Sequence, residues 1–394
     1  MPRVYLKRGR EKSILRRHPW IFSGAVERVE GDPAAGATVD VVAHSGEFLA
    51  RAAYSPTSQI RLRVWTFDES QAVDADFLRS RLARAIESRR QLGLLAAGRA
   101  CRLVFGESDG LPGLIVDRYA DFVVCQFLAA GADAWRSTLA EALLELCSAT
   151  GVYERSESGL RRKEGLQSQR GLLLGSEPPA VIEVQTPPTR HLVDIVNGQK
   201  TGTYLDQQWN RARVAAYARD ARVLDAFAYT GGFAIACLRA GAAGATLIET
   251  SAEALRVAER DAELNAVAGA CELSANNVFD ELRVLRDAER QFGLVVLDPP
   301  KFVHSADQLR SGSRGYKDIN LLGLQLVKAG GILATFSCSG HVDGALFQKI
   351  VAGAALDAGR DAQILERLSQ PPDHPVALEF PEGEYLKGLI LRVH

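Results

Sequence analysis

One acidic and one thiol side chain follow two apolar runs in the last third of the sequence. Asp298 follows residues 294–297, and Cys338 follows residues 332–337. Short apolar runs of this kind are typical of buried parallel strands. Because ligands bind outside the carboxyl ends of parallel strands, we expect Asp298 and Cys338 to share a crevice. A carboxylate can hold a polar base, and a thiolate is a strong nucleophile near neutral pH.

The elements around these two residues follow a regular order. Residues 308–328 have helical spacing and end at Gly330 and Gly331, which makes a strand–helix–strand unit. The same alternation begins upstream, with strands expected at 222–225, 245–249 and 271–274 and a helix at 252–265. Alternation of strands and helices predicts a doubly wound parallel sheet over residues 186–394.

The first strand of this region is followed by a glycine-rich turn. Asp225 ends the strand, Gly231 and Gly232 precede a helix, and Glu249 ends the second strand. Glycines let a backbone approach a ligand, and an acid at the second strand's end can bind a ribose diol. The turn lacks the three-glycine fingerprint of dinucleotide sites. We therefore favour an adenosyl ligand without a pyrophosphate over NAD.

The first half of the chain predicts two smaller domains. Short alternating segments at 21–26, 38–42, 47–52 and 60–65 indicate a small β-barrel over residues 1–70. Residues 71–185 read as an α+β domain, with helices at 74–95 and 132–147 and strands at 101–105, 114–117, 122–127 and 152–155. Proline pairs at 178–179 and 187–188 mark the next boundary, since such pairs break helices and central strands.

Charge is unevenly distributed although the net charge is only -1. Basic residues gather in the first 28 positions and again between 155 and 170. They are Arg3, Lys7, Arg8, Arg10, Lys12, Arg16, Arg17 and Arg28, then Arg155, Arg161, Arg162, Lys163 and Arg170. Arg51, Arg61 and Arg63 alternate with apolar positions and could add a basic strand face. Such patches predict contact with a phosphate backbone, and the alternative is a solvated surface.

Other features exclude several protein classes. The six cysteines form no C-x-x-C pair, which argues against zinc ribbons and disulfide scaffolds and fits a reducing cytoplasm. His18, His191 and His341 show no ligand spacing, so we predict no metal. No apolar stretch approaches the roughly 20 residues that a bilayer requires. We expect a cytoplasmic protein of 394 residues without a membrane partner.

Several motifs resemble one family, the bacterial 23S rRNA cytosine-C5 methyltransferases called large-subunit methyltransferase I. They lie at residues 201–207, 229–233, 298–302, 314–320 and 336–340, and further likenesses lie at 7–25, 106–113 and 161–165. The resemblance implies a Rossmann-like class I methyltransferase domain, preceded by a small β-barrel PUA domain and an α+β central domain. It also implies S-adenosylmethionine as cofactor and 23S rRNA, or a large-subunit precursor, as partner.

The resemblance also assigns site residues. The catalytic residues are Cys338 and Asp298. The cofactor-binding residues are Phe227, Tyr229, Thr230, Gly231, Gly232, Glu249, Asn277, Asp298, Asp206 and Gln207, and the RNA-binding residues are Lys7, Arg8, Arg10, Arg61 and Lys301. The chain departs from the family in having Gln208 where Arg is common, and Asn276 and Asn277 where an Asp is usual.

The implied reaction is covalent. A thiolate of Cys338 adds to C6 of cytosine and so activates C5 for methyl transfer. Asp298 holds N3 and the exocyclic amine. The base that then removes the C5 proton stays open among water, Asp298 and Lys301, since Lys301 stands where two-cysteine relatives carry their second cysteine.

Two other functions remain compatible with the sequence. Asp298-Pro-Pro also suits an enzyme that methylates exocyclic amines of rRNA, which needs no covalent cysteine. Gln208 and Asn277 fit a non-catalytic RNA-binding or ribosome-assembly factor. An NAD dehydrogenase is a more distant alternative, and a homodimer is an open possibility.

Overall fold

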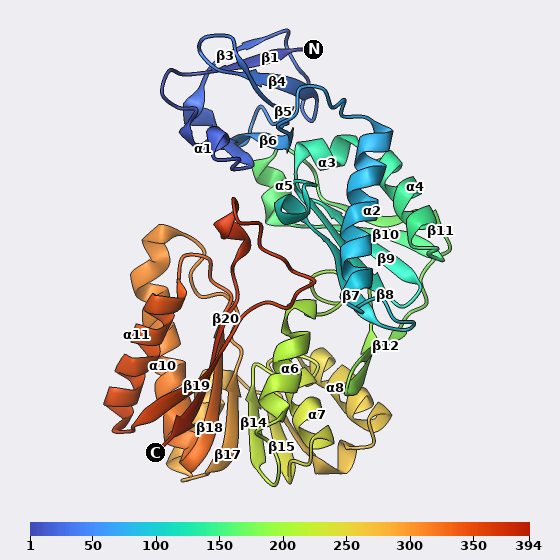
Figure 1. The fold of residues 1–394 in the computed structure, drawn as a ribbon. Helices are drawn as coiled ribbons and strands as arrows, with labels where there is room; N and C mark the ends of the chain where they lie inside the picture. Colours follow the sequence, from blue (N-terminus) through green and yellow to red (C-terminus); the bar gives the residue numbers. More distant parts are fainter. The chain divides into compact units, whose positions relative to one another are not determined.

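The computed structural model describes residues 1–394, which divide into two compact units (Figure 1). The first unit consists of Met1–Val184, Val193–Leu205 and Pro372–Gly383, and the second of Gln185–Leu192, Asp206–Pro371 and Glu384–His394. Each unit is therefore assembled from stretches that are distant in the sequence. None of the helices combines the length and the apolar character needed to cross a membrane.

The N-terminal part of the first unit is a six-stranded sheet. Alternate side chains such as Val39, Val41, Ala50 and Ala52 are buried in one hydrophobic core. This period of two is expected for strands with one face toward a core. The strands are β1 (Arg3–Leu6), β2 (Trp20–Phe22), β3 (Val26–Glu30), β4 (Thr38–Val42), β5 (Phe48–Tyr54) and β6 (Ile60–Thr66), in the order β2-β6-β5-β4-β1-β3, with a short helix α1 (Lys12–Leu15).

The central part of the first unit is a five-stranded sheet with helices. Its strands are β7 (Ala100–Phe105), β8 (Leu114–Tyr119), β9 (Phe122–Phe127), β10 (Gly151–Ser156) and β11 (Gln169–Gly175), in the order β11-β10-β9-β8-β7. Its helices are α2 (Ala75–Gln91), α3 (Ala130–Ala134), α4 (Arg136–Leu146) and α5 (Gly159–Lys163). The helix expected at 132–147 is therefore wrong as one element, because the backbone at Trp135 (φ -100°, ψ 15°) leaves the helical region.

A β-hairpin joins the central part to the remainder of the chain. It pairs β12 (Ile182–Thr186) with β13 (Thr189–Val193), and Pro187 and Pro188 form its turn. Proline has no N–H to donate to a ladder, so this pair ends one strand before the next begins.

The second unit is built on a seven-stranded sheet in the order β16-β15-β14-β17-β18-β20-β19. The strands are β14 (Arg222–Ala226), β15 (Gly244–Ile248), β16 (Cys271–Ser274), β17 (Phe292–Leu297), β18 (Val327–Ser337), β19 (Ala362–Leu368) and β20 (Lys387–Val393). The first five strands in this order are parallel, and β20 and β19 are antiparallel to their neighbours.

Helices cover both faces of this sheet (Figure 1). Leu294 and Val296 of β17 face one core, and Val295 and Leu297 face the other. The first core also receives side chains from α6 (Gln208–Ala215), α7 (Gly232–Arg239) and α8 (Ala252–Leu264). The second receives them from α9 (Val278–Asp287), α10 (Leu309–Leu326) and α11 (Gly344–Ala358). The predicted doubly wound, Rossmann-like domain is confirmed.

Candidate active site and cofactor crevice

Asp298 and Cys338 lie at the ends of two neighbouring parallel strands. Strands β17 and β18 pair directly, with Leu297 opposite Thr335. Asp298 is the first residue after β17, and Cys338 is the first after β18. Both side chains are half-buried. The carboxylate and the thiol therefore lie at the same edge of the sheet and are accessible to a ligand.

Cys338 differs in its surroundings from the other five cysteines. Cys101, Cys125, Cys147 and Cys237 are buried, and burial raises the pKa of Cys147 to about 11. Cys271 is half-buried, but it begins β16 and so lies at the amino end of a parallel strand. Burial also raises the pKa of Cys271 to about 11. Cys338 is thus the only cysteine at the carboxyl edge of the sheet.

The residue after Cys338 anchors the turn that carries the thiol. Ser339 is buried, and its hydroxyl forms a hydrogen bond of 2.9 Å with the Tyr316 hydroxyl. The same hydroxyl accepts a hydrogen bond from the backbone N–H of Val303 at 3.3 Å. Val303 follows Asp298 by only a few residues, so Ser339 links the turn of the thiol to the turn of the carboxylate. Sequence reasoning missed Tyr316 and Ser339.

A lysine from the last strand contacts the same turn. Lys387 Nζ donates to the backbone oxygens of Ser339 and Tyr385, at 2.8 Å each. The side chain is half-buried, and burial lowers the pKa of Lys387. Sequence reasoning also missed Lys387, since nothing in residues 387–393 indicates which strand they join.

The glycine-rich turn after β14 is sharply bent. Every second residue from Phe227 to Gly231 has a positive φ angle: Phe227 at 64°, Tyr229 at 50° and Gly231 at 74°. A Cβ added at Gly231 would lie 2.7 Å from Leu247 Cδ2, and one at Gly232 would lie 2.6 Å from Arg211 Cζ. Close packing therefore leaves little room for a side chain at either glycine, and the positive φ of Gly231 also favours glycine at that position.

Two acidic side chains border this turn. Asp225 is buried; its Oδ2 accepts a hydrogen bond from the Ala234 N–H (2.9 Å), and its Oδ1 has no partner in the protein. Burial raises the pKa of Asp225 to about 7. Glu249 follows β15, and it accepts hydrogen bonds of 3.0 Å from the backbone N–H groups of Tyr229 and Ser251. Glu249 thus lies directly against the turn.

The remaining predicted cofactor residues have structural partners of their own. Asp206 and Gln207 are buried; Asp206 accepts a hydrogen bond from the Tyr385 hydroxyl (2.7 Å), and Gln207 accepts one from Asn210 (2.6 Å). Asn277 is exposed and caps α9, where its Oδ1 accepts from the next turn's N–H groups at 3.0 and 3.3 Å. The Nδ2 group of Asn277 takes no part in these capping bonds, so it can donate to a ligand.

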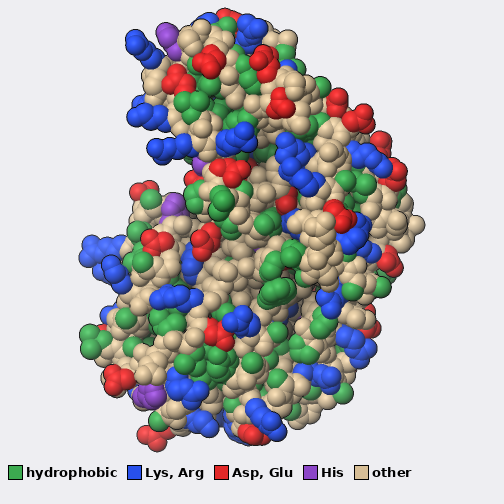
Figure 2. Space-filling view, in the orientation of Figure 1, with side chains coloured by type: hydrophobic (Ala, Val, Ile, Leu, Met, Phe, Trp, Pro, Cys, Tyr) green, Lys and Arg blue, Asp and Glu red, His purple; other side chains and the backbone are tan.

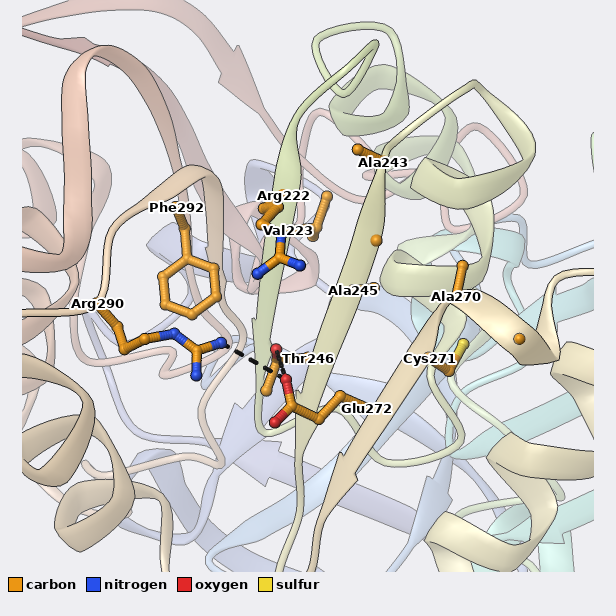
Figure 3. A pocket seen from close by; sticks show the side chains of 12 residues that line it. Arg222, Val223, Ala243, Ala245, Thr246, Ala270, Cys271, Glu272, Arg290 and Phe292 are labelled. Carbon is orange, nitrogen blue, oxygen red and sulfur yellow. Dashed lines mark hydrogen bonds and ion pairs between the residues drawn. The ribbon is translucent and has the colours of Figure 1, made fainter. Parts of the chain in front are cut away.

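A separate pocket lies at the opposite edge of the sheet (Figure 3). It has a volume of about 240 Å³ and is lined by the first residues of four parallel strands: Arg222, Gly244, Cys271 and Phe292. Glu272 and Arg290 form an ion pair there at 3.6 Å, and Thr246 donates to Glu272 at 2.9 Å. This pocket lies at the other end of the strands from Asp298 and Cys338, so it is separate from the two residues predicted to be catalytic.

The predicted RNA-binding residues are distributed over both units. Lys7, Arg8 and Arg10 are exposed on the N-terminal domain, where Figure 2 shows several basic side chains among acidic ones. Arg61 and Lys301 are half-buried, and Arg61 donates to the backbone oxygen of Pro56.

Three arginines were expected to give a basic strand face, but two of them pair with acidic side chains. Arg51 pairs with Asp40 at 3.1 Å, and Arg63 pairs with Glu164 at 2.8 Å and with Glu107 at 3.4 Å. These acids neutralise both guanidinium groups, so the expectation of a continuous basic face was wrong.

Comparison with known proteins agrees with this architecture. Residues 4–67 match the model of a PUA-like domain, and residues 163–392 match that of an S-adenosylmethionine-dependent methyltransferase. Ribosomal RNA large subunit methyltransferase I of Aeromonas salmonicida is 51% identical over 99% of this chain and 98% of its own length. The protein of the same name from Escherichia coli O139:H28 is 48% identical, over 99% of each chain. The chain belongs to the ribosomal RNA large subunit methyltransferase I family.

Solved structures give the same fold. A protein assigned as a SAM-dependent methyltransferase from Streptococcus mutans aligns over the full length of both chains with a TM-score of 0.85 and 19% identity. A methyltransferase complexed with SAH aligns over the full length with a TM-score of 0.86 and 19% identity. At this level of identity the likeness concerns the fold alone.

The residues around the bent turn suit the family's cofactor, S-adenosylmethionine. The bent turn after β14 leaves its backbone accessible, and Glu249 lies beside it with a carboxylate that can accept further hydrogen bonds. The unpartnered Oδ1 of Asp225 is a buried acceptor that a polar or cationic ligand would satisfy. No group of three His, Cys, Asp or Glu side chains is arranged to hold a metal ion.

Proposed function

We propose that the protein transfers a methyl group to carbon 5 of a cytosine in 23S rRNA through a covalent bond between Cys338 and C6. One observation carries the proposal: the Cys338 thiol and the Asp298 carboxylate follow directly paired parallel strands, beside the crevice of a methyltransferase. The names of the curated relatives support large-subunit rRNA as the substrate.

Cys338 supplies the activation that the substrate lacks. Carbon 5 of cytosine is a poor nucleophile, and addition of the thiolate to C6 moves the electron pair of the C5–C6 double bond toward C5. C5 would then bond to the methyl group of a bound cofactor, whose sulfur–methyl bond would break and leave the electron pair on sulfur as a neutral thioether. Loss of the C5 proton to a base restores the double bond and expels the thiolate, so the cysteine is regenerated.

Asp298 orients the base and balances its charge. Its carboxylate accepts a hydrogen bond from the exocyclic amine, and in its protonated form it donates to N3 as negative charge develops on the ring. Pro299 and Pro300 follow directly and have no N–H groups, so they do not compete for this carboxylate. Water, Asp298 and Lys301 are the candidates for the base that removes the C5 proton.

Residues around the glycine-rich turn would hold the cofactor. Glu249 would accept hydrogen bonds from the ribose hydroxyls, Asn277 Nδ2 would contact the adenine edge, and Phe227 through Gly232 would line the ligand. Asp206 and Gln207 would complete the site on the side of α6. When bound, S-adenosylmethionine supplies an electrophilic methyl group.

RNA must present the target base outside its stack, because a base paired within a helix cannot bring C6 against the half-buried thiol of Cys338. Lys7, Arg8 and Arg10 on the PUA-like domain, with Arg61 and Lys301, would bind phosphates and orient the strand.

Covalent trapping tests the proposal. RNA with 5-fluorocytidine at the target has no C5 proton to lose, so turnover should stop at a stable protein–RNA adduct at Cys338, seen as a band of low mobility and by peptide mass spectrometry. Cys338→Ala should give no adduct and no 5-methylcytidine. An adduct formed by Cys338→Ala would contradict the mechanism.

The Cys338→Ala variant also distinguishes this mechanism from the main alternative, methylation of an exocyclic amine. An enzyme that methylates an exocyclic amine needs no covalent cysteine, so Cys338→Ala would retain much of its turnover and nucleoside mass spectrometry would show N-methylcytidine or N-methyladenosine.

A further inference from the structure

Lys387 comes from the antiparallel strand that lies beside Cys338. In the ladder between β18 and β20, Lys387 is paired with Ser337, the residue that precedes Cys338. Its ammonium group donates to the carbonyl oxygen of Ser339, the residue that follows Cys338, at 2.8 Å. Lys387 therefore contacts the chain on both sides of the thiol-bearing residue.

The ammonium group of Lys387 has no ion-pair partner. Its hydrogen bonds go to two backbone oxygens, of Ser339 and Tyr385, and no carboxylate lies within ion-pair distance. Backbone oxygens satisfy the donors of an ammonium group without neutralising its charge. The positive charge of Lys387 is thus available to a neighbouring anion.

We infer that Lys387 is a positioning residue for the reaction, which holds the turn of Cys338 and stabilises the thiolate form of this cysteine. The inference rests on the proposed function, since only a nucleophilic cysteine requires a thiolate. A cation beside a cysteine, in a half-buried place that screens charge poorly, is a general way to make a thiolate available near neutral pH.

The charges around Lys387 are consistent with this role. Burial lowers the pKa of Lys387, and negative charge at Cys338, Glu384 and Asp343 opposes this shift, whereas Lys301 reinforces it. Cys338 lies next to Ser339, whose carbonyl oxygen accepts from Lys387, so its thiolate would lie within electrostatic range of the ammonium group. On the other side of the turn, Tyr316 is bonded to Ser339 and its own pKa is raised by burial, so it stays neutral.

The pair works over a limited pH range. Below the pKa of the thiol, Cys338 is protonated and the ammonium group has no anion to stabilise. Above the lowered pKa of Lys387, the ammonium group is lost and the advantage disappears. The thiolate of Cys338 is therefore favoured in the interval between these two titrations.

Alkylation of Cys338 measures this effect without RNA or cofactor. The full-length protein is treated with iodoacetamide across a pH series, and the rate at Cys338 is followed by peptide mass spectrometry, which separates it from Cys271. The wild-type rate should rise with a midpoint below about 8.5, the ordinary value of a thiol. A wild-type midpoint at or above that value would overturn the inference.

Two substitutions separate charge from hydrogen bonding. Lys387→Gln keeps a donor for the Ser339 oxygen but removes the charge, and its midpoint should rise by about one pH unit, which slows alkylation near neutral pH about tenfold. Lys387→Arg keeps the charge and should retain the wild-type profile. Lys349→Gln makes the same change at an exposed lysine of α11; it is the matched control and should change nothing.

An unchanged midpoint in Lys387→Gln would leave Lys387 a structural role only and refute the inference. The result is independent of the methylation chemistry. A shifted midpoint in Lys387→Gln together with no adduct on 5-fluorocytidine RNA would disprove the covalent mechanism but not the thiolate stabilisation. An unchanged midpoint together with an adduct would disprove the thiolate stabilisation but not the covalent mechanism.

Discussion

The two edges of the methyltransferase sheet carry similar side chains but differ in how these are held. The carboxyl edge has Cys338 and Asp298, and the amino edge has Cys271 and Glu272. At the carboxyl edge, Ser339 connects the two turns through hydrogen bonds. At the amino edge, Glu272 is more than half exposed and is paired with Arg290. Residue type alone therefore does not make a site.

The difference follows from the topology of parallel strands. Each strand end at the carboxyl edge passes into a loop before the next helix, and neighbouring loops such as those of β17 and β18 meet there. At the amino edge the strand starts at Arg222, Gly244 and Cys271 surround an open pocket (Figure 3). The following substitutions test whether the two edges differ in function as they do in structure.

The largest expected effect comes from replacing each of the two half-buried cysteines separately with alanine. Cys338→Ala should lower methyl transfer to rRNA by about 10³-fold or more, the scale of losing a nucleophile. Cys271→Ala should keep turnover within about twofold, because its thiol lies at the other edge and burial raises its pKa to about 11. Tritium transfer from labelled S-adenosylmethionine measures both. Equal losses in the two variants would remove the functional distinction between the edges.

A smaller effect is expected from replacing the carboxylates at the two edges, Asp298 and Glu272. Asp298→Asn preserves shape but not charge, and it should lower kcat by about 10²- to 10⁴-fold, the range for acid–base groups. Glu272→Gln should leave kcat unchanged and alter the free energy of unfolding by less than about 1 kcal/mol, because surface ion pairs contribute little. A kcat of Asp298→Asn close to that of the wild type would assign the carboxylate no part in the chemistry.

The last prediction concerns stability and pH rather than turnover. Burial raises the pKa of Asp225 to about 7, against about 4 in an unfolded chain. Between these values the folded state binds more protons, so the free energy of unfolding should fall as pH rises, by up to about 1.4 kcal/mol per pH unit, and level off above pH 7. Urea unfolding without ligand measures this.

Asp225→Asn should abolish this fall, whereas Glu272→Gln should retain it, because the side chain of Glu272 is mostly exposed. A fall that persists unchanged in Asp225→Asn would show that another group titrates.

Much of the fold was predictable from local patterns. The alternation of apolar runs and helical segments after residue 193 predicted the doubly wound sheet, and the strand ends predicted that Asp298 and Cys338 would share an edge. Strand β1 was missed, because its two buried residues, Val4 and Leu6, stand next to a run of charged residues. Asn277 as the cap of α9 could have been found, since Asn before a helical segment is a common capping signal.

The partners of charged groups were not predictable. Arg63 was predicted to be part of a basic face, yet it pairs with Glu164, which lies 101 positions later in the sequence. Lys387 binds the turn that carries Cys338 because β20 enters the sheet antiparallel beside β18. No local pattern specifies such a pairing, since it depends on which surface remains free when distant segments pack.

The sequence by itself determined the period of each element, the sharp turn at Gly231 and Gly232, and the positions of Asp298 and Cys338 at strand ends. These are short-range properties, set by backbone sterics and by the burial of apolar side chains. Only the tertiary structure decided which charges are neutralised and which cysteine lies in a turn that a lysine binds. The reason is that electrostatic interactions depend on distance through space, and the residues that set them here are separated along the chain by dozens of positions.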